Sequence, residues 1–533
     1  MAFLTTTWRR WLLRNVEGKD LVKWGGEVAQ SERRNVGHST MGKPFLTLED
    51  LKACFSLFCC VYGIGTLGMP GNYARAGYVW ATLSLLFMAA VNMYATVCIS
   101  KVLLVVPKSV RTLGDLGHYS MGIVGRVLIN VTQLMTCVLV PIAFLVLGSI
   151  MLTILFPGSY EQKTWIIFMG VSLLPITLVP TLKEGAFAAA AGCLGTVMAD
   201  GIALYLLVDN MTPIPAGVST PKPDLNFKAV ASVFGNLALA YGAGIVIPAI
   251  QREHSDPTRM PRIIYVTLGT ISVLFMVVAI TGVSVVGCQI PGNLLFSIAG
   301  APTKLGFTAN RGGVILAMLF MQLHVTIAFA VIMTPGFYIL ERVVFGLHKH
   351  AFEEIAAHEV EAGGYDNVET PVADKTDDQV TKVNGVEHHD LDSATYRQPG
   401  VYPKVAALRI VVVAAAVAIA VAWKDHLLDL LDFTGAFCIA LCCMILPIVF
   451  YLKQFGNTIS LPERIWAYVA VIASLFLGGY VTYQSAGPLF NPPATSTAAP
   501  EWDEPKFQFC PPDSSYARIV YSNVSYHANW TKP

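Results

Sequence analysis

Long apolar blocks divide this sequence, and they constrain its fold more than any other feature. Ten or more of them reach the roughly 20 residues that a helix needs to cross the hydrocarbon core of a bilayer. They are continuously apolar and lack the ten-residue alternation of barrel strands. Charged residues make up 13% of the chain, against about 25% in soluble domains. The sequence therefore predicts an all-α integral membrane protein embedded in a lipid bilayer.

We expect eleven transmembrane helices within one membrane domain, residues 51–484. The expected spans are 52–74, 77–104, 123–155, 164–182, 186–208, 229–250, 262–288, 312–345, 405–423, 427–453 and 464–483. Tails of 1–50 and 485–533 flank this domain. The connection 346–402 is acidic and histidine-rich, which is typical of a disordered loop. A metal site in that loop is the alternative, although its histidines fit no tight spacing.

Lys and Arg in the connections predict the orientation, because they accumulate on the cytosolic side. With the amino terminus in the cytosol, the inner connections hold the larger share, among them Lys101, Arg126 and Arg464. The outer connections hold fewer, among them Arg75 and Lys424. An odd number of spans then places the carboxyl terminus outside or in a lumen. Such a protein has no continuous basic face, so we expect no nucleic-acid partner.

The carboxyl-terminal tail carries two features of an outer segment. Asn523 and Asn529 each begin an N-glycosylation sequon. Cys510 in this tail and Cys288 at the outer end of the seventh span are the two cysteines that are not in the interior of an expected span. They could form a disulfide over the outer face. Two unpaired thiols are the alternative.

Two expected spans carry glycine and proline clusters at corresponding places. GIGTLGMP (63–70) lies in the first span and AYGAGIVIP (240–248) in the sixth. Each has Gly-x-Gly followed four or five residues later by proline, and each opens a block of five spans. Paired interruptions of this kind are the best sequence indication of a transporter binding site. Close helix packing by small residues is the alternative.

A broken helix can bind an amino acid with backbone groups alone. Freed N–H groups and a half-helix amino terminus suit a carboxylate, whereas freed carbonyls suit an ammonium group or a coupling cation. Tyr241 could cover the substrate, with packing as its alternative. The expected substrate-binding residues are Gly63, Ile64, Gly65, Thr66, Leu67, Tyr241, Gly242, Ala243 and Gly244.

Four segments resemble the amino acid/auxin permease family. They are GIGTLGMPGNYARAGY (63–78), AYGAGIVIPAIQREHSDPTRMPRIIY (240–265), LHVTIAFAVIMTPGFYILE (323–341) and DFTGAFCIALCCMILPIVFYLK (432–453). They occur in the family's order, and the third is similar to the plant lysine/histidine-type members. The resemblance implies the leucine-transporter fold, a 5+5 inverted repeat, here with one extra carboxyl-terminal helix. It also implies amino acid transport driven by H⁺ or Na⁺, with no cofactor or bound metal.

The second motif departs from this family pattern at two positions. Members closest to it often have histidine where this chain has Gly244, and glutamate where it has Ala249. A polar contact at these positions is therefore missing. We expect selectivity and coupling to be decided there and at His324.

Ionisable residues deep in a membrane are costly, so each is a candidate for ion coupling. Asp200 is the clearest acid within a span, and His324 could carry a proton or be a neutral imidazole bonded to a carbonyl. Thr326 and Thr334 could bind sodium, or could bond back to their own helix.

Secondary active transport of amino acids by alternating access is the leading hypothesis. An amino acid sensor of the same fold, without net transport, is the alternative. A membrane-embedded enzyme is disfavoured because no second catalytic group accompanies His324 at a recognisable spacing. We expect a monomeric transport unit in the plasma membrane or the vacuolar or lysosomal membrane.

Overall fold

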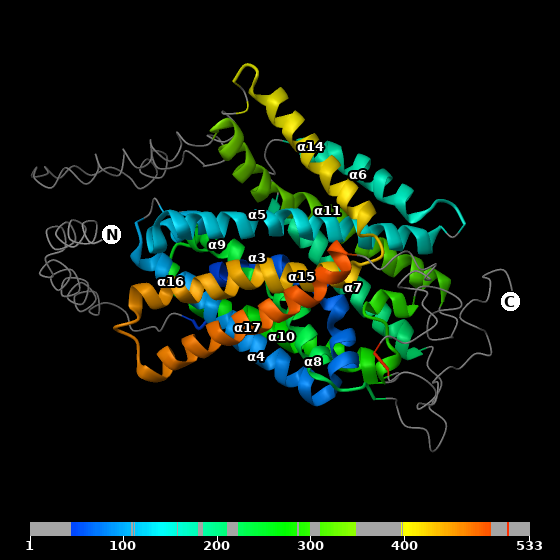
Figure 1. Ribbon diagram of the computed structural model, residues 1–533, viewed down its shortest axis with the longest axis horizontal. Coiled ribbons are helices and arrows are strands. Elements are labelled where there is room, and N and C mark those ends of the chain that lie inside the picture. Colours follow the sequence, from blue (N-terminus) through cyan, green and yellow to red (C-terminus); the bar gives the residue numbers. More distant parts are fainter. Residues whose placement is uncertain are drawn as a thin grey trace, which may run out of the picture. The chain divides into compact units, whose positions relative to one another are not determined.

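The computed structural model describes residues 44–107, 110, 112–156, 158–179, 185–209, 222–284, 287–298, 310–347, 396, 398–491 and 509–510. Figure 1 shows the arrangement of the helices, and no strand occurs among these residues. The α-helices are α3 (Leu48–Val61), α4 (Met69–Val105), α5 (Leu113–Leu155), α6 (Gln162–Leu178), α7 (Gly185–Asp209), α8 (Phe227–Ala240), α9 (Ile247–Glu253), α10 (Met260–Ser284), α11 (Arg311–Phe345), α14 (Val401–Ala422), α15 (Leu427–Phe433), α16 (Leu446–Phe455) and α17 (Leu461–Phe490). Short 3₁₀ helices are η2 (Ile64–Gly68), η3 (Ala243–Val246), η4 (Pro257–Arg259), η5 (Gly287–Gln289) and η6 (Leu294–Ile298), and η7 (Thr434–Ile445) is a π-helix.

Nine helical stretches in the described part of the chain are long and apolar enough to cross a membrane. Helix α6 is apolar but shorter, with 17 residues. One of the nine stretches, Ile64–Val105, joins the end of the first expected span to the whole of the second. Among the described residues, each expected span still lies mostly within helix. The all-helical membrane architecture is therefore confirmed, whereas eleven separate crossings stay a prediction.

Two glycines divide long helices at expected span boundaries. Gly77 in α4 and Gly122 in α5 both have a φ of 68°, outside helical geometry. This region of φ is open to glycine and strained for other residues. The second span is expected to begin at residue 77 and the third at residue 123, so each glycine lies at a turn between segments.

The first, sixth and tenth expected spans are not continuous α-helices. The chain leaves α3 after Val61, passes through η2 and restarts as α4. It leaves α8 after Ala240, passes through η3 and restarts as α9. The tenth span contains the π-helix η7 between α15 and α16. We call residues 62–68 the first break and residues 241–246 the second break.

Packing brings these interrupted helices to the centre. Helix α8 packs against η2, α4 and η7, while α11 packs against α5 and α7. A Cβ built on Gly435 of η7 would lie 1.9 Å from the carbonyl oxygen of Gly235 in α8. Such close approach requires glycine at position 435. Around this centre, α6 and α14 run side by side, as Figure 1 shows.

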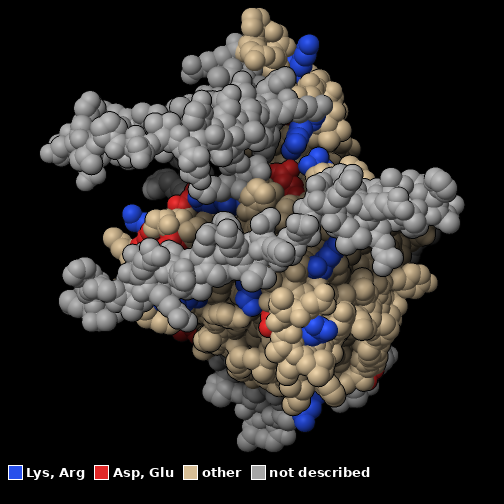
Figure 2. All heavy atoms as spheres, turned by 90° about the vertical axis from the view of Figure 1, so that its left-hand side faces the viewer, with Lys and Arg blue, Asp and Glu red and all other residues tan. Residues whose placement is uncertain are grey.

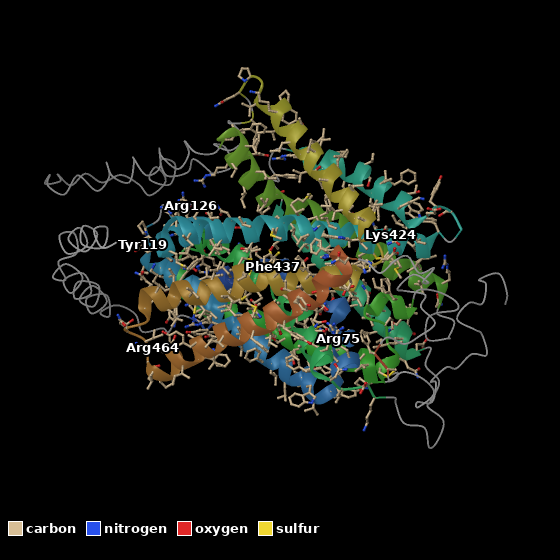
Figure 3. The ribbon with its side chains drawn as sticks, in the orientation of Figure 1. Arg75, Tyr119, Arg126, Lys424, Phe437 and Arg464 are labelled. Carbon is tan, nitrogen blue, oxygen red and sulfur yellow. A yellow bond between two sulfur atoms is a disulfide. The ribbon has the colours of Figure 1, made fainter. Side chains whose placement is uncertain are left out.

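Basic side chains mark two ends of the helical bundle. Figure 3 shows Arg126 and Arg464 at one end, and Arg75 and Lys424 toward the other. Figure 2 looks at the first of these ends, where Lys and Arg outnumber acidic residues on the described surface. The two residues at the first end belong to the connections expected on the inner side, and the other two belong to those expected on the outer side. Which end faces the cytosol stays a prediction.

A buried ion pair links α11 to α14 beside the bundle. Arg409 donates to Glu341 at 2.9 Å, and Tyr396 donates to the same carboxylate at 2.7 Å. Arg409 also donates to the carbonyl oxygens of Thr177 and Val179 at the end of α6. Because Glu341 and Arg409 are both buried, losing either partner would leave a charge uncompensated. This network holds α6, α11 and α14 together.

Several expectations fall outside the described residues. They concern most of the 1–50 tail, most of the 346–402 connection, and the sequons at Asn523 and Asn529. These expectations stay predictions.

Candidate functional site

In the first break, several backbone N–H groups have no acceptor within the helical turn to which they belong. Tyr62 N donates to Phe58 O at 2.8 Å and closes α3. Thr66 N and Thr66 Oγ1 both donate to Gly63 O at 3.0 Å. The first N–H groups of a helical turn have no acceptor within that turn. Those of Gly63, Ile64 and Gly65 are therefore available to a ligand.

The second break satisfies more of its donors internally. Tyr241 N donates to Leu237 O at 3.1 Å, and Gly242 N to Leu239 O at 3.3 Å. Ala243 N donates to Tyr241 O at 2.5 Å. Because these three N–H groups already have acceptors, the second break offers fewer donors to a ligand than the first.

The first break packs against α8, the helix that leads into the second break. A Cβ built on Gly65 would lie 2.6 Å from the Cβ of Ala240, closer than real Cβ atoms approach. A Cβ built on Gly68 would collide with the amide of Asn236. Glycines in the first break therefore let it pack directly on the helix that leads into the second.

A cavity of about 190 Å³ lies beside both breaks. Its walls come from α3, η2, α5, α7, α8, η3, α11 and η7. The lining residues are Cys59, Cys60, Val61, Gly63, Ile64, Gly65, Thr136, Cys137, Val140, Phe144, Gly192, Leu239, Ala240, Gly242, Ile245, Val246, His324, Ile327, Ala328, Val331, Ile332, Pro335 and Ile439. Four of the expected substrate-binding residues, Gly63, Ile64, Gly65 and Gly242, line it.

The other expected substrate-binding residues are buried away from this cavity. Thr66, Leu67, Tyr241, Ala243 and Gly244 are buried and absent from its lining. A Cβ built on Gly244 would lie 3.0 Å from the Cα of Cys443. A side chain at this position would therefore require η7 to move slightly away.

His324 lines the cavity and faces the first break. Its Nδ1 lies 3.0 Å from the carbonyl oxygen of Gly192 on α7. A carbonyl only accepts, so Nδ1 carries the proton in this bond and Nε2 of the neutral ring is an acceptor. A Cβ built on Gly63 would lie 3.2 Å from that Nε2. His324 thus has both the bond to a neighbouring carbonyl and a free acceptor beside the cavity.

Asp200 does not line the cavity, but it contacts the first break through Tyr62. Tyr62 Oη donates to Asp200 Oδ2 at 3.0 Å. The other carboxyl oxygen, Oδ1, is buried without a hydrogen-bond partner in the described part of the chain. The side chains of Thr326 and Thr334 bond back to the carbonyls of Gln322 and Ala330, each at 2.8 Å. Neither threonine forms a hydrogen bond to Asp200 in the described part of the chain.

Tyr62 is a site residue that the sequence reasoning missed. Tyrosine precedes Gly-x-Gly in both breaks, as Tyr62 and Tyr241, and this repeat was the available signal. Tyr241 Oη lies 2.7 Å from Ser272 Oγ. Phe275 lies against both tyrosines, with ring centroids 6.0 Å from Tyr62 and 5.2 Å from Tyr241.

One polar network lies beyond the first break, on the α4 side. Arg75 Nη1 lies 3.0 Å from Asp432 Oδ2, and its Nη2 donates to Asn72 Oδ1 at 2.8 Å. Asn72 Nδ2 in turn donates to Asn236 Oδ1 at 2.8 Å. We call Asn72, Arg75, Asn236 and Asp432 the Arg75 network. It joins α4, α8 and α15, and no lining residue of the cavity belongs to it.

A second network lies before the first break, where α3 begins. Arg259 donates to buried Asp50 through Nε at 2.8 Å and Nη2 at 2.6 Å. His254 Nδ1 accepts from Asp256 N, so its Nε2 donates to Asp50 at 3.0 Å. We call Asp50, His254 and Arg259 the Asp50 network. Along the first expected span, the cavity residues lie between the two networks.

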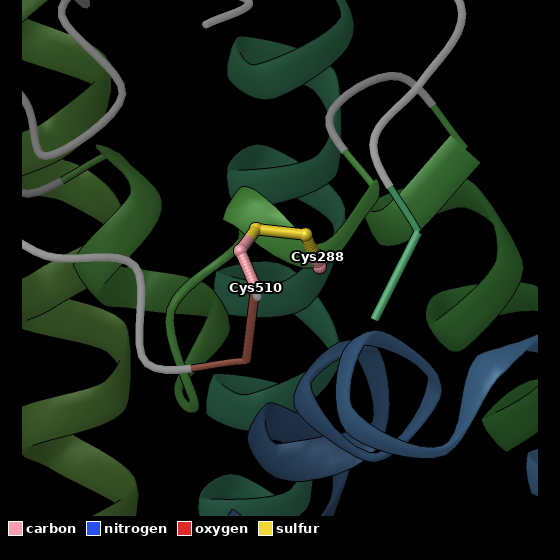
Figure 4. The surroundings of a disulfide bond; sticks show 2 residues. All are labelled: Cys288 and Cys510. Atoms are coloured by element: carbon pink, nitrogen blue, oxygen red, sulfur yellow. A yellow bond between two sulfur atoms is a disulfide. The ribbon is translucent and has the colours of Figure 1, made fainter. Parts of the chain in front are cut away.

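A disulfide joins Cys288 to Cys510, with their Cα atoms 5.1 Å apart (Figure 4). The bond places Phe509 beside the Arg75 network. Phe509 lines a small cavity of about 10 Å³ together with Arg75 and Asp432. Phe509 of the tail thus lies against this network.

The fold and the site define an integral membrane protein whose interrupted helices surround a buried, mostly apolar cavity. A family model described as "Transmembrane amino acid transporter protein" matches residues 49–486. The chain belongs to this family, whose members are transporters rather than enzymes.

Similar proteins include two from Arabidopsis thaliana. Amino acid transporter AVT1I is 23% identical over 268 residues, which are 48% of this chain and 62% of that protein. Amino acid transporter AVT1B is 22% identical over 235 residues, 42% of each chain. The chain therefore matches about half the length of these relatives.

Two solved structures are similar at 12% identity. One is a manganese transporter of Eremococcus coleocola, with a TM-score of 0.47, covering 86% of this chain and 91% of that one. The other is MhsT in complex with L-phenylalanine, with a TM-score of 0.41, covering 82% of this chain and 98% of that one.

Proposed function

We propose that this chain is a secondary active transporter of amino acids that works by alternating access. The observation that carries the proposal is the cavity lined by glycines of both breaks. Family membership supports amino acids as the cargo. In this proposal the eleven expected spans form the 5+5 inverted repeat of the leucine-transporter fold, plus one further helix, in a monomeric transport unit.

The first break supplies the recognition of groups common to all amino acids. The substrate carboxylate accepts from the free N–H groups of Gly63, Ile64 and Gly65, at the positive end of a helical turn. The ammonium group donates to the free carbonyls at the end of α3 and to Nε2 of His324, which faces Gly63. Both charges are then paired next to the apolar walls.

In this proposal, the two polar networks control to which side of the membrane the cavity opens. The Arg75 network ties the chain after the first break to α8 and α15, and the Asp50 network ties the chain before it to the η4 connection. Opening one network while the other stays closed would expose the cavity to one side at a time. We assign the Arg75 side to the exterior or lumen and the Asp50 side to the cytosol of a plasma, vacuolar or lysosomal membrane.

We place the coupling cation at Asp200, and we assign it as a proton. A buried ionised carboxylate without full hydrogen bonding is costly, so a proton on Asp200 stabilises the described arrangement. Tyr62 connects this carboxyl group directly to the first break. Loss of the proton would therefore alter the hydrogen bonding of Tyr62 at the start of the break.

Reconstituted full-length protein tests this proposal. Labelled amino acids are supplied to proteoliposomes, with proton and sodium gradients imposed separately. We expect saturable uptake that the proton gradient drives above equilibrium. Accumulation with a sodium gradient alone would overturn the proton assignment. Saturable binding without flux would favour the sensor, the alternative with the same fold.

A further inference from the structure

The walls of the cavity separate into a polar strip and an apolar remainder. The strip consists of the glycines of the two breaks and His324. The remainder is formed by aliphatic and aromatic side chains of six elements. These are Val61, Val140, Phe144, Leu239, Ile245, Val246, Ile327, Val331, Ile332 and Ile439. A bound amino acid with its charged ends on the strip would direct its side chain toward this apolar wall.

Charged side chains are absent from the described lining of the cavity. No Asp, Glu, Lys or Arg is among those residues. The nearby carboxyl group of Asp200 lies behind the break, bonded to Tyr62. Thr136 Oγ1 donates to the carbonyl of its own helix at 2.9 Å. A charged substrate side chain would thus lose its hydration without gaining a charged partner, which is strongly unfavourable.

The size of the cavity suits a large apolar side chain. Its volume of about 190 Å³ exceeds the roughly 150 Å³ of an engineered apolar cavity that holds benzene. Burial of a side chain such as leucine or phenylalanine gives roughly ten- to hundredfold tighter binding than exposure to water. The cavity therefore favours substrates with large apolar side chains and excludes substrates with charged side chains.

We propose that the substrates are neutral amino acids with large apolar side chains, such as leucine, isoleucine, methionine and phenylalanine. This inference rests on the proposed transport function and names its substrate class. Val331 and Ile327 on α11 act as specificity-determining residues, because they give the wall its apolar character. Lysine, arginine, aspartate and glutamate are excluded by the missing counter-charge.

The test measures uptake of labelled leucine, phenylalanine, lysine and glutamate into proteoliposomes holding the full chain. We expect kcat/KM for leucine and phenylalanine to exceed that for lysine and glutamate by at least about a hundredfold, since an unpaired buried charge costs several kcal/mol. Lysine or glutamate transport as efficient as leucine transport would overturn the inference while leaving the proposed function intact. Transport and binding of none of the twenty amino acids would instead remove the proposed function.

A substitution in the wall tests the assignment of specificity. Val331→Asp places a carboxylate in the cavity, so the ratio of lysine to leucine uptake should rise about tenfold or more, as expected for a gained ion pair in a partly desolvated site. The matched control is Val343→Asp on the same helix, where the side chain is 75% exposed and outside the cavity. The control should keep the wild-type ratio. An unchanged ratio in a well-expressed Val331→Asp protein would contradict the role of this wall.

Ala328 offers a second, independent variant. It lines the cavity on the same helix, and Ala328→Leu would fill part of its volume without adding charge. We expect phenylalanine uptake to fall more than tenfold, while alanine uptake changes by less than about threefold, as overpacking predicts. Equal loss for both substrates, with normal surface expression, would count against a size-selective wall.

Discussion

The two breaks begin with the same pattern, Tyr-Gly-x-Gly, yet their surroundings differ. In the first, Tyr62 donates to a buried acid, and Gly63 and Gly65 line the cavity. In the second, Tyr241 pairs with Ser272, and Gly244 packs against Cys443. The first N–H groups of the turn in the first break have no acceptor in that turn, whereas Tyr241, Gly242 and Ala243 of the second break donate to carbonyls of α8 or of the break itself.

This difference teaches that a repeated motif can serve two purposes. An interrupted helix creates free backbone groups only where the following turn leaves them without acceptors. The first break has this property, and its Tyr62 is hydrogen-bonded to Asp200, which supports the proposed binding of a carboxylate and of a proton there. The second break supplies one glycine and neighbouring apolar side chains to the wall. We infer that recognition and coupling are concentrated in the first break.

The largest predicted effect separates Gly65 from Gly242. A Cβ at Gly65 would meet the Cβ of Ala240 at 2.6 Å, whereas one at Gly242 would meet Ile439 at 3.4 Å. Gly65→Ala should therefore lower kcat/KM for uptake about ten- to hundredfold, as expected for overpacking that displaces the break. For Gly242→Ala, kcat/KM for uptake should stay within about threefold of the wild-type value. Surface expression of each variant is the control, and equal effects would remove the distinction between the breaks.

The next prediction concerns the acid behind the first break. Asp200→Asn keeps the shape of the side chain but cannot exchange a proton. We expect proton-driven accumulation to disappear while exchange of substrate across the membrane continues. Ser272→Ala, at the corresponding partner of Tyr241, should keep proton-driven accumulation. Retained accumulation in Asp200→Asn vesicles would place the coupling proton elsewhere, with His324 as the next candidate because it lines the cavity.

A smaller effect should distinguish the two tyrosines. Tyr62→Phe removes a hydrogen bond to a carboxyl group, and Tyr241→Phe removes one to a serine. The first variant should change the proton concentration that gives half-maximal uptake about tenfold, because hydrogen bonds to charged groups contribute about 1.5–3 kcal/mol. The second should leave this dependence unchanged and lower thermal stability by about 1 kcal/mol. Uptake measured across a pH series, with thermal unfolding in parallel, checks both.

Sequence patterns predicted the helices and the breaks because their signals are local. Apolar runs indicate membrane-length helices, and Gly-x-Gly with proline indicates an interruption. Gly63, Gly65, Gly242 and His324 lie at the cavity as these signals suggested. Local patterns also suggested Tyr241 and Gly244 as substrate-binding residues. These two residues instead pack against α10 and η7.

Contacts across long separations in the chain were beyond sequence reasoning. Tyr62 and Asp200 are 138 residues apart, and Arg75 and Asp432 are 357 apart. Neither residue of such a pair indicates its partner, because the pairing depends on how distant helices pack. The expectation that selectivity and coupling are decided at the second break and His324 stays a prediction. The sequence named Asp200 as a candidate acid but could not show that it bonds to Tyr62 of the first break.

Protection of a native thiol tests the central claim most directly. Cys60 is exposed to the cavity just before the first break, whereas Cys54 is half-buried and outside the cavity. In proteins whose other free cysteines are replaced by serine, a thiol reagent is applied to membranes on ice with and without leucine. We predict that leucine slows labelling of Cys60, with half-protection near its KM for uptake, and leaves Cys54 unchanged. Transported leucine that gives Cys60 no protection would contradict a substrate site at the first break.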